Sequence, residues 1–197
     1  MATHQLKRLS RQQAVFLCCD IQSIFKATVH KFDHVATTAS FLVEAAKVMG
    51  IPVVVSEQYP DKLGHTVPSI DLQQAHVYSK TLFSMVSPSF PNSLLTSRSS
   101  FVLFGIETHV CVQQTALDLL EIGKHVVLVT DGVSSSRPLD RSTAISRLSS
   151  AGAILMTAES VLFELMRSKD ADEFRDISRI AKAIATYAKE NETLCSL

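Results

Sequence analysis

The chain has 197 residues, which predicts one domain with a substantial apolar core. Lys plus Arg and Asp plus Glu number 19 each, so no net charge attracts nucleic acid or an anionic membrane surface. The four cysteines, at positions 18, 19, 111 and 195, lack the paired spacing of a zinc site and indicate reduced thiols in an intracellular protein. No apolar run reaches the ~18 residues of a membrane-spanning helix.

The N-terminal segment carries basic but no acidic side chains. Lys7, Arg8 and Arg11 fall within the first 19 residues, a composition that a short mitochondrial presequence would share. We expect a solvated N-terminal arm over residues 1–13 instead, because a strand begins directly after it. The expected compartment is the cytoplasm, with the mitochondrion as the alternative.

The first half of the chain alternates strands with helical spacing. Residues 14–19 form a continuous apolar run, which is typical of a strand buried on both faces. Apolar residues then recur at helical spacing between a cap at Asp33 and a stop at Gly50, and a second buried strand follows at 51–55. Residues 56–99 are irregular, apart from a short strand at 76–80.

The second half continues the alternation and ends in two helical segments. Its predicted elements are a strand at 100–104, a helix from about Thr108 to Ile122, a strand at 125–129 that Asp131-Gly132 turns out of, a helix at 141–150, a strand at 153–156, and helices at 158–166 and 172–190. Such alternation predicts an α/β fold of three αβα layers, with about six mainly parallel strands. We expect a single domain over residues 1–197, in which residues 170–197 form a C-terminal helix and a frayed tail.

Three reactive side chains follow three of the predicted strands. Asp20, Lys80 and Cys111 would meet in one crevice, because the carboxyl ends of parallel strands share an edge of the sheet. A cysteine in the first turn of a helix is favoured as the thiolate, which is the nucleophilic form. A carboxylate can take the thiol proton, and an ammonium group stabilises both anions.

Each of these residues also has a purely structural interpretation. Cys111 could be a small apolar residue packed where a strand meets a helix. Asp20 could cap the segment that follows it, and Lys80 could be a surface lysine whose stem covers an apolar edge.

Three motifs in the chain match those of a known family. Asp20-Ile21-Gln22, Ser79-Lys80-Thr81 and the segment 105–112, Gly-Ile-Glu-Thr-His-Val-Cys-Val, together resemble the isochorismatase-like cysteine hydrolases. The resemblance extends from Val15 to about Phe163. Ser56 to Pro60 with Leu63-Gly64, and Lys80 to Met85, resemble more narrowly the isochorismatase domain-containing subgroup, which includes kinetoplastid proteins named as mitochondrion-associated ribonucleases.

The resemblance implies a Rossmann-like fold and an Asp20–Lys80–Cys111 triad that attacks amide, ureido or related carbonyl groups through a covalent thiol intermediate. It also implies a cis peptide bond between Ile106 and Glu107. The family arrangement would aim backbone N–H groups, including that of Cys111, at a developing oxyanion. The expected partners are a small-molecule substrate and further copies of the chain in a homo-oligomer, without a membrane or nucleic acid.

The chain departs from related nicotinamidases at their metal site. Those enzymes hold a metal through an Asp-x-His arrangement after the second strand, where this sequence reads Ser-Glu-Gln-Tyr-Pro at 56–60. His65 stands alone, so we expect no catalytic metal and no other cofactor. His109 would project away from Cys111 on a helix, which favours a supporting or interface role.

Further side chains are candidates for substrate binding. These are Gln22, Phe25, Tyr59 and Phe83, although Gln22 could equally cap a turn and the aromatic rings could simply pack in the core. Apolar residues at helical spacing in the last helix, from Phe174 to Tyr187, predict packing on the sheet or a subunit contact.

The function expected from the sequence is therefore that of a metal-independent thiol hydrolase. One alternative is a ribonuclease, which the zero net charge and the lack of a basic stripe disfavour. The other is a non-catalytic oligomeric scaffold in which the triad is a relic.

Overall fold

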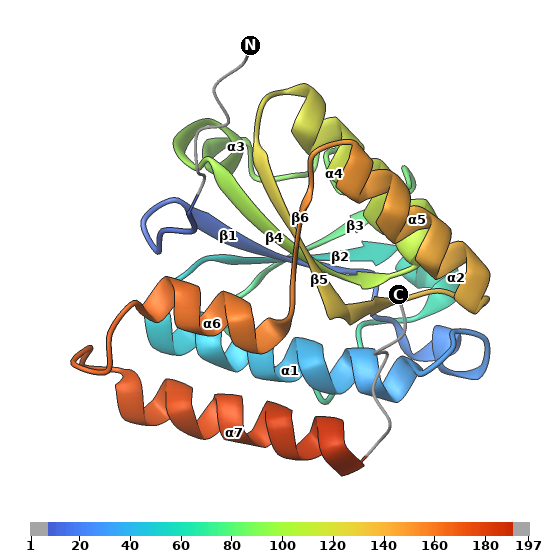
Figure 1. Cartoon of the computed structure of the whole chain (residues 1–197). Helices are drawn as coiled ribbons and strands as arrows, with labels where there is room; N and C mark the ends of the chain where they lie inside the picture. The colour runs from blue at the N-terminus through green and yellow to red at the C-terminus, as the bar shows by residue number, and fades with distance from the viewer. Residues whose placement is uncertain (1–7, 191–197) are drawn as a thin grey trace.

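The computed structural model describes residues 8–190. Lys7, Cys195 and the expected frayed end lie outside the described residues. Six parallel strands form one sheet in the order β3-β2-β1-β4-β5-β6 (Figure 1). The strands are β1 (Ala14–Cys19), β2 (Val53–Gln58), β3 (His76–Lys80), β4 (Ser100–Ile106), β5 (His125–Ser134) and β6 (Ile154–Met156).

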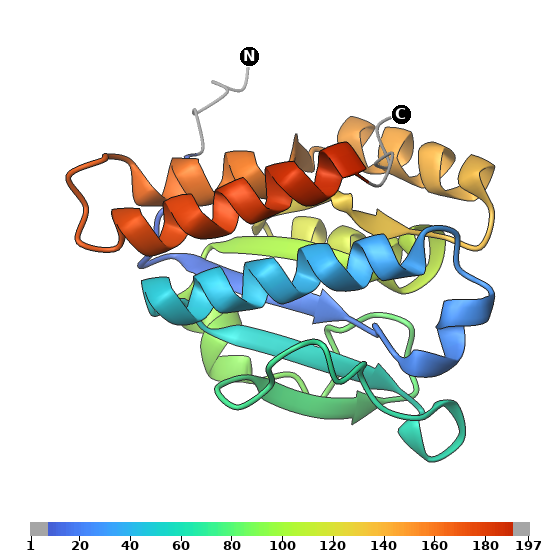
Figure 2. The same cartoon turned by 90° about the horizontal axis from the view of Figure 1, so that it is seen from below.

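Helices cover both faces of this sheet, which confirms the predicted three-layer α/β architecture (Figures 1 and 2). One face carries α1 (Phe32–Met49) and α6 (Ala158–Met166), with α7 (Phe174–Glu190) packed against both. The other face carries α3 (Asn92–Ser97), α4 (Gln113–Glu121) and α5 (Pro138–Ser150). Short helical turns at Ser23–Ala27 (η1), Pro60–Leu63 (α2) and Thr108–Val112 (η2) lie in the connections.

Strand β1 shows why the sheet holds two separate cores. All six of its residues are fully buried, as its continuous apolar sequence predicts. Successive side chains of a strand point to opposite faces, so Phe16 and Cys18 pack under α1 while Val15 and Leu17 pack under α4 and α5. Burial of each large apolar side chain contributes about 1.5–3 kcal/mol.

Several predicted boundaries were wrong. Strand β2 covers Val53–Gln58 instead of residues 51–55, and α3 forms within the region 56–99 that was expected to be irregular. Strand β5 continues through Asp131 and Gly132 to Ser134, with a register shift against β4 between Leu103 and Gly105. The expected turn does not form there because the guanidinium of Arg141, on α5, donates to the carbonyl oxygens of Thr130 and Val133 and holds the chain extended. The helix expected from Thr108 is divided instead into the π-helical turn η2 and α4.

The described part of the N-terminal arm is packed rather than solvated. Leu9 is buried, and its backbone N–H donates to the Glu164 carboxylate at 2.8 Å. Arg11 donates to the Met49 carbonyl oxygen and to Glu173. The chain therefore reaches β1 along the outside of α6.

The apolar stripe of α7 is covered by the chain itself. Ile177, Ile180 and Ile184 are buried against α1 and α6, rather than lying directly on the sheet. Among residues 8–190, no helix is both long and apolar enough to cross a membrane.

Candidate active site

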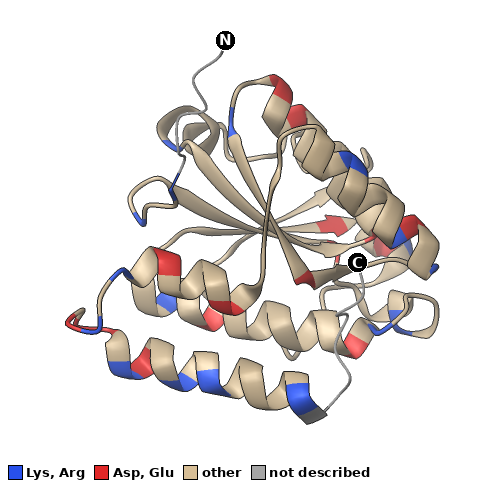
Figure 3. Cartoon of the chain, viewed as in Figure 1, with Lys and Arg blue, Asp and Glu red and all other residues tan. Residues whose placement is uncertain are grey.

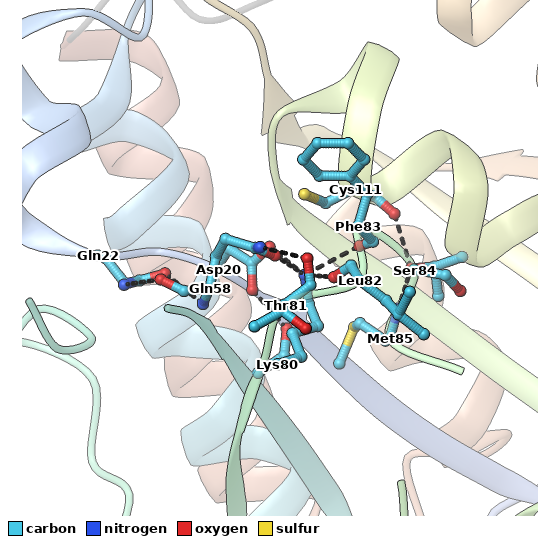
Figure 4. A network of polar contacts seen from close by, with 12 residues as sticks. Asp20, Gln22, Gln58, Lys80, Thr81, Leu82, Phe83, Ser84, Met85 and Cys111 are labelled. Carbon is cyan, nitrogen blue, oxygen red and sulfur yellow. Dashed lines mark hydrogen bonds and ion pairs between the residues drawn. The ribbon is translucent and has the colours of Figure 1, made fainter. Parts of the chain in front are cut away.

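A buried ion pair links the ends of two strands that are not neighbours. Asp20 directly follows β1 and has the left-handed backbone conformation, with φ of 49°. Lys80 is the last residue of β3, on the far side of β2. Its ammonium nitrogen Nζ lies 2.7 Å from Oδ2 of Asp20, and the two side chains are 0% and 2% exposed (Figure 4). The pair is thus shielded from water.

Every part of this ion pair has further hydrogen-bond partners. Lys80 Nζ also donates to Oε1 of Gln58 at 2.7 Å and to the carbonyl oxygens of Leu82 and Phe83 at 3.1 and 2.9 Å. The Ser56 hydroxyl donates to Oδ1 of Asp20 at 2.7 Å. A buried ion pair is stable only when such additional bonds replace the lost water.

Electrostatics keep the lysine charged in this setting. Burial by itself lowers the pKa of Lys80, but the acidic groups of Cys19, Asp20 and Cys111 together raise that pKa above its usual value. The ammonium group therefore supplies a fixed positive charge behind the Asp20 carboxylate.

Cys111 reaches the same region from the other side of β1. It lies in the π-helical turn η2, after a cis peptide bond between Ile106 and Glu107. The Glu107 carbonyl oxygen accepts hydrogen bonds from the N–H groups of Val110 and Val112, at 3.0 and 3.3 Å. The nucleophile candidate thus sits in a π-helical turn, not in the first turn of a regular α-helix; such turns occur frequently at functional sites.

The Cys111 turn is tied to the segment that follows Lys80. The Thr115 hydroxyl donates to the Cys111 carbonyl oxygen at 2.7 Å and accepts from the Met85 N–H group at 2.8 Å. Figure 4 shows Cys111 close to Phe83, within the same network. The positions of Cys111 and of the loop after β3 are therefore coupled.

One cavity of about 220 Å³ brings these groups together. Its lining contains both Asp20 and Cys111, so the carboxylate and the thiol face a common space. Lys80 does not line the cavity and supports Asp20 from behind. The remaining lining residues are Phe25, Gln58, Leu63, Phe83, Ile106, Glu107 and Val110.

Two residues expected to bind substrate are not on this cavity. Gln22 is fully buried; its amide donates to the carbonyl oxygens of Gln58 and Gly64 and accepts from the Gln58 N–H group. It therefore holds the loop after β2, much as the turn-capping alternative implies. Tyr59 lines a separate cavity of about 420 Å³, together with residues 79–82 and 87–89.

Sequence reasoning missed the residues that hold the Asp20–Lys80 ion pair. Ser56 and Gln58 are two residues apart on β2, so their side chains share one face of the sheet. That spacing was a usable signal once Asp20 and Lys80 had been placed on the neighbouring strands. The carbonyl oxygens of Leu82 and Phe83 carry no sequence signal, because every residue has one.

The other described cysteines differ from Cys111 in their surroundings. Cys18 and Cys19 are fully buried in the strand, and burial raises the pKa of both thiols.

A neighbouring glycine is required beside Cys19. A Cβ atom on Gly105 would lie 2.1 Å from the Cys19 carbonyl oxygen, and the φ of 123° at Gly105 disfavours other residues.

His65 and His109 lie outside the cavity. His65 is exposed and pairs with Glu57 at 2.9 Å. His109 Nδ1 lies 3.0 Å from the Ser135 hydroxyl, and its ring stands between the carboxylates of Glu107 and Asp140. Within residues 8–190, no group of three or more His, Cys, Asp or Glu side chains is arranged to hold a metal ion.

Comparison with known proteins identifies relatives of the chain. Residues 14–160 match the model of the isochorismatase domain. Isochorismatase domain-containing protein 1 of Danio rerio is 45% identical over 183 residues, which are 91% of this chain and 65% of the relative. The chain thus spans slightly less than two thirds of that relative's length.

Solved structures show the same fold. A structure described as the MAR1 ribonuclease of Caenorhabditis elegans has a TM-score of 0.85 and 36% identity, over 88% of this chain and 92% of that one. YcaC from Pseudomonas aeruginosa, described with hexane-2,5-diol and covalent acrylamide, has a TM-score of 0.82 and 26% identity, over 97% and 100% of the two chains.

Proposed function

The chain belongs to the isochorismatase family, and from this premise we propose that it is a cysteine hydrolase of small amides or related carbonyl compounds, with Asp20, Lys80 and Cys111 as its catalytic residues. The observation that carries the proposal is the fully partnered Asp20–Lys80 ion pair, whose carboxylate shares one cavity with the Cys111 thiol. A buried carboxylate beside a thiol is suited to move a proton.

The proposed reaction has two halves. In the first, Asp20 takes the thiol proton, and the Cys111 sulfur attacks the carbonyl carbon to give a tetrahedral intermediate. Asp20 then gives the proton to the leaving amine, so that a thioester remains on Cys111. In the second half Asp20 takes a proton from water, the hydroxide attacks the thioester, and an acid is released as the thiol is restored.

The protein groups around Cys111 have distinct proposed roles. Lys80 keeps Asp20 in place and offsets its charge. The Cys111 N–H group is the proposed oxyanion donor, because the neighbouring N–H groups of Val110 and Val112 already donate to Glu107. Phe25 and Phe83 form cavity walls against which the substrate would lie.

A relative supports the covalent step. The YcaC structure from P. aeruginosa is described as containing covalent acrylamide. A protein of this fold therefore contains a nucleophile that reacts with acrylamide. Because nucleophiles add to the vinyl carbon of acrylamide, the adduct supports a reactive nucleophile and does not itself represent attack on a carbonyl carbon.

The test is the rate of iodoacetamide labelling at pH 7, resolved by cysteine with mass spectrometry. We expect Cys111 to react at least tenfold faster than Cys18 and Cys19, which are enclosed in the sheet. The Asp20→Asn variant should lose most of this rate, whereas the control Asp61→Asn, at an exposed position beside the other cavity, should keep it. Equal labelling of all three cysteines in the native protein would contradict the hydrolase and favour the scaffold.

Ribonuclease activity is the second candidate, because structures described as MAR1 ribonucleases share the fold. Figure 3 shows Lys and Arg interspersed with Asp and Glu along most helices, although the charged residues of α7 (Phe174–Glu190) are mainly basic. Binding of the phosphate groups of RNA depends on a basic protein surface, and the zero net charge of the chain disfavours this candidate. Degradation of a defined RNA that persists in Cys111→Ser and disappears at high salt would favour the nuclease instead.

A further inference from the structure

We infer that the cavity accepts uncharged or cationic carbonyl compounds and discriminates against substrates that carry a carboxylate. This inference rests on the proposed function and narrows its substrate class. It excludes the ureido acids that the broader expectation allowed, and retains small amides with an apolar acyl group.

The charges around the cavity are the first argument. Of the nine described residues that line it, Asp20 and Glu107 are acidic, and none is Lys, Arg or His. Lys80 offsets the charge of Asp20, so the net negative charge comes from Glu107, whose carboxylate also accepts from the Ser136 N–H group at 2.7 Å. Enzymes that bind carboxylate substrates hold them with a charged donor, most effectively the guanidinium of arginine. This cavity instead presents negative charge, which has the same sign as a carboxylate.

Lys80 does not supply the missing cation. Its side chain is 0% exposed and lies outside the cavity lining. Its ammonium group already donates to four oxygen atoms, those of Asp20, Gln58, Leu82 and Phe83. An ammonium group has three protons, so none remains for a ligand.

The size and polarity of the cavity are the second argument. A volume of about 220 Å³ lies below the roughly 300–1,000 Å³ of pockets for drug-sized ligands, so the cavity suits a smaller molecule. Most of the walls are apolar, formed by the side chains Phe25, Leu63, Phe83, Ile106 and Val110. A carboxylate placed here would lose its water shell without gaining a partner, which is strongly unfavourable. An apolar acyl group has no such favourable hydration to lose when it enters the cavity.

The experiment uses three methanethiosulfonate reagents that differ in charge. The methyl reagent is neutral, the 2-ammonioethyl reagent is a cation and the 2-sulfonatoethyl reagent is an anion. In each case the Cys111 thiolate attacks the divalent sulfur of the reagent, which carries the methyl or ethyl group. A mixed disulfide forms and methanesulfinate leaves. Rates at Cys111 are measured by mass spectrometry and divided by the rates with N-acetylcysteamine, an uncharged free thiol, which removes intrinsic reactivity.

We expect the normalised rate of the anion to be at least tenfold below that of the neutral reagent, and the cation to react at least as fast as the neutral one. Glu107→Gln should raise the anion's rate relative to the neutral reagent by at least threefold. Asp61→Asn removes the same charge outside this cavity and should leave the ratio unchanged.

The outcomes separate this inference from the proposed function. An anion that reacts as fast as the neutral reagent in the native protein would overturn the charge selection and leave the thiol hydrolase standing. Equal shifts in Glu107→Gln and Asp61→Asn would also overturn it, because the effect would then come from net charge. Failure of every reagent to label Cys111 would overturn the hydrolase itself, and the inference with it.

Discussion

Lys80 and His34 are both buried ionisable side chains near the carboxyl ends of the strands, and their surroundings are opposite. Lys80 has four oxygen acceptors, and neighbouring acids raise its pKa. His34, on α1, is 5% exposed, and neither ring nitrogen makes a hydrogen bond of standard geometry within the described part of the chain, although a contact with the Asp131 backbone favours its charged form. Its ring stacks on Tyr187 of α7, with 5.3 Å between the ring centroids.

The difference shows what allows a charge to persist inside this fold. Burial alone disfavours the charged form of either side chain. At Lys80, the acidic groups of Cys19, Asp20 and Cys111 offset that effect and raise the pKa, whereas at His34 burial prevails and lowers the pKa. Lys80 is thus held as a cation, and His34 is held as a neutral ring.

Lys80→Met should cause the largest loss of stability, because it removes the charge that distinguishes Lys80 from His34. The Asp20 carboxylate would remain buried with the Ser56 hydroxyl as its side-chain partner. Removing one member of a buried ion pair costs about 3–5 kcal/mol, so we expect the free energy of unfolding in urea to fall by this amount. The double variant Asp20→Asn/Lys80→Met has no charge at this pair of positions and should recover more than half of the loss. A single-variant loss below 1 kcal/mol would show that the pair is not buried as described.

A smaller loss is expected from Gln22→Met, which removes a partner of the loop that carries Gln58. Two carbonyl oxygens and one N–H group would lose their partner. Each buried group left unpaired costs about 1–3 kcal/mol, and relaxation of the loop should limit the total to about 2–3 kcal/mol in urea unfolding. Gln12→Met, at an exposed position, is the matched control. If Gln22 bound substrate instead, its replacement would alter activity without this loss of stability.

His34→Leu should raise the stability of the protein, unlike the two preceding substitutions. Replacing an unpaired buried polar ring by an apolar side chain of similar size removes a desolvation penalty. We expect the free energy of unfolding at pH 7 to rise by up to about 1 kcal/mol. A loss of more than 1 kcal/mol would reveal a polar partner of His34 in the folded protein.

The smallest expected effect is the pH dependence of stability that His34 contributes. The unfolded chain titrates this ring near 6.5, and burial places the folded pKa lower. Above pH 6.5 the ring is neutral in both states, so stability is at its full value. As the pH falls through 6.5 toward the folded pKa, the unfolded state binds the proton first and stability is lost. Subtracting the His34→Leu pH profile from the native one isolates this loss, and a flat difference would contradict it.

The site was partly predictable because its reactive residues follow strands. Asp20, Lys80 and Cys111 stand after three apolar or alternating runs, and parallel strands bring such positions together. The sheet itself followed from the same runs, with the strands buried on both faces giving the clearest signals. Sequence alone can thus predict that polar residues at the ends of parallel strands lie near one another.

The remainder depended on contacts that sequence patterns do not encode. Gln22 is polar and adjacent to Asp20, and only the structure shows that its amide holds backbone groups instead of facing the cavity. The extension of β5 to Ser134 depends on Arg141, whose guanidinium reaches back from a later helix. The π-helical turn at Cys111 arises from bonds to one carbonyl oxygen, which no residue type announces.

The bonds from Lys80 to the carbonyl oxygens of Leu82 and Phe83 have a consequence for how this family can diversify. They fix the backbone of the cavity wall without involving the side chains at positions 82 and 83, which are 54% and 51% exposed. Replacements at position 83 can therefore reshape this cavity, and replacements at position 82 the separate Tyr59 cavity, while the ion pair keeps its geometry. These two side chains can thus vary, in evolution or in the laboratory, without a change in the Asp20–Lys80 ion pair.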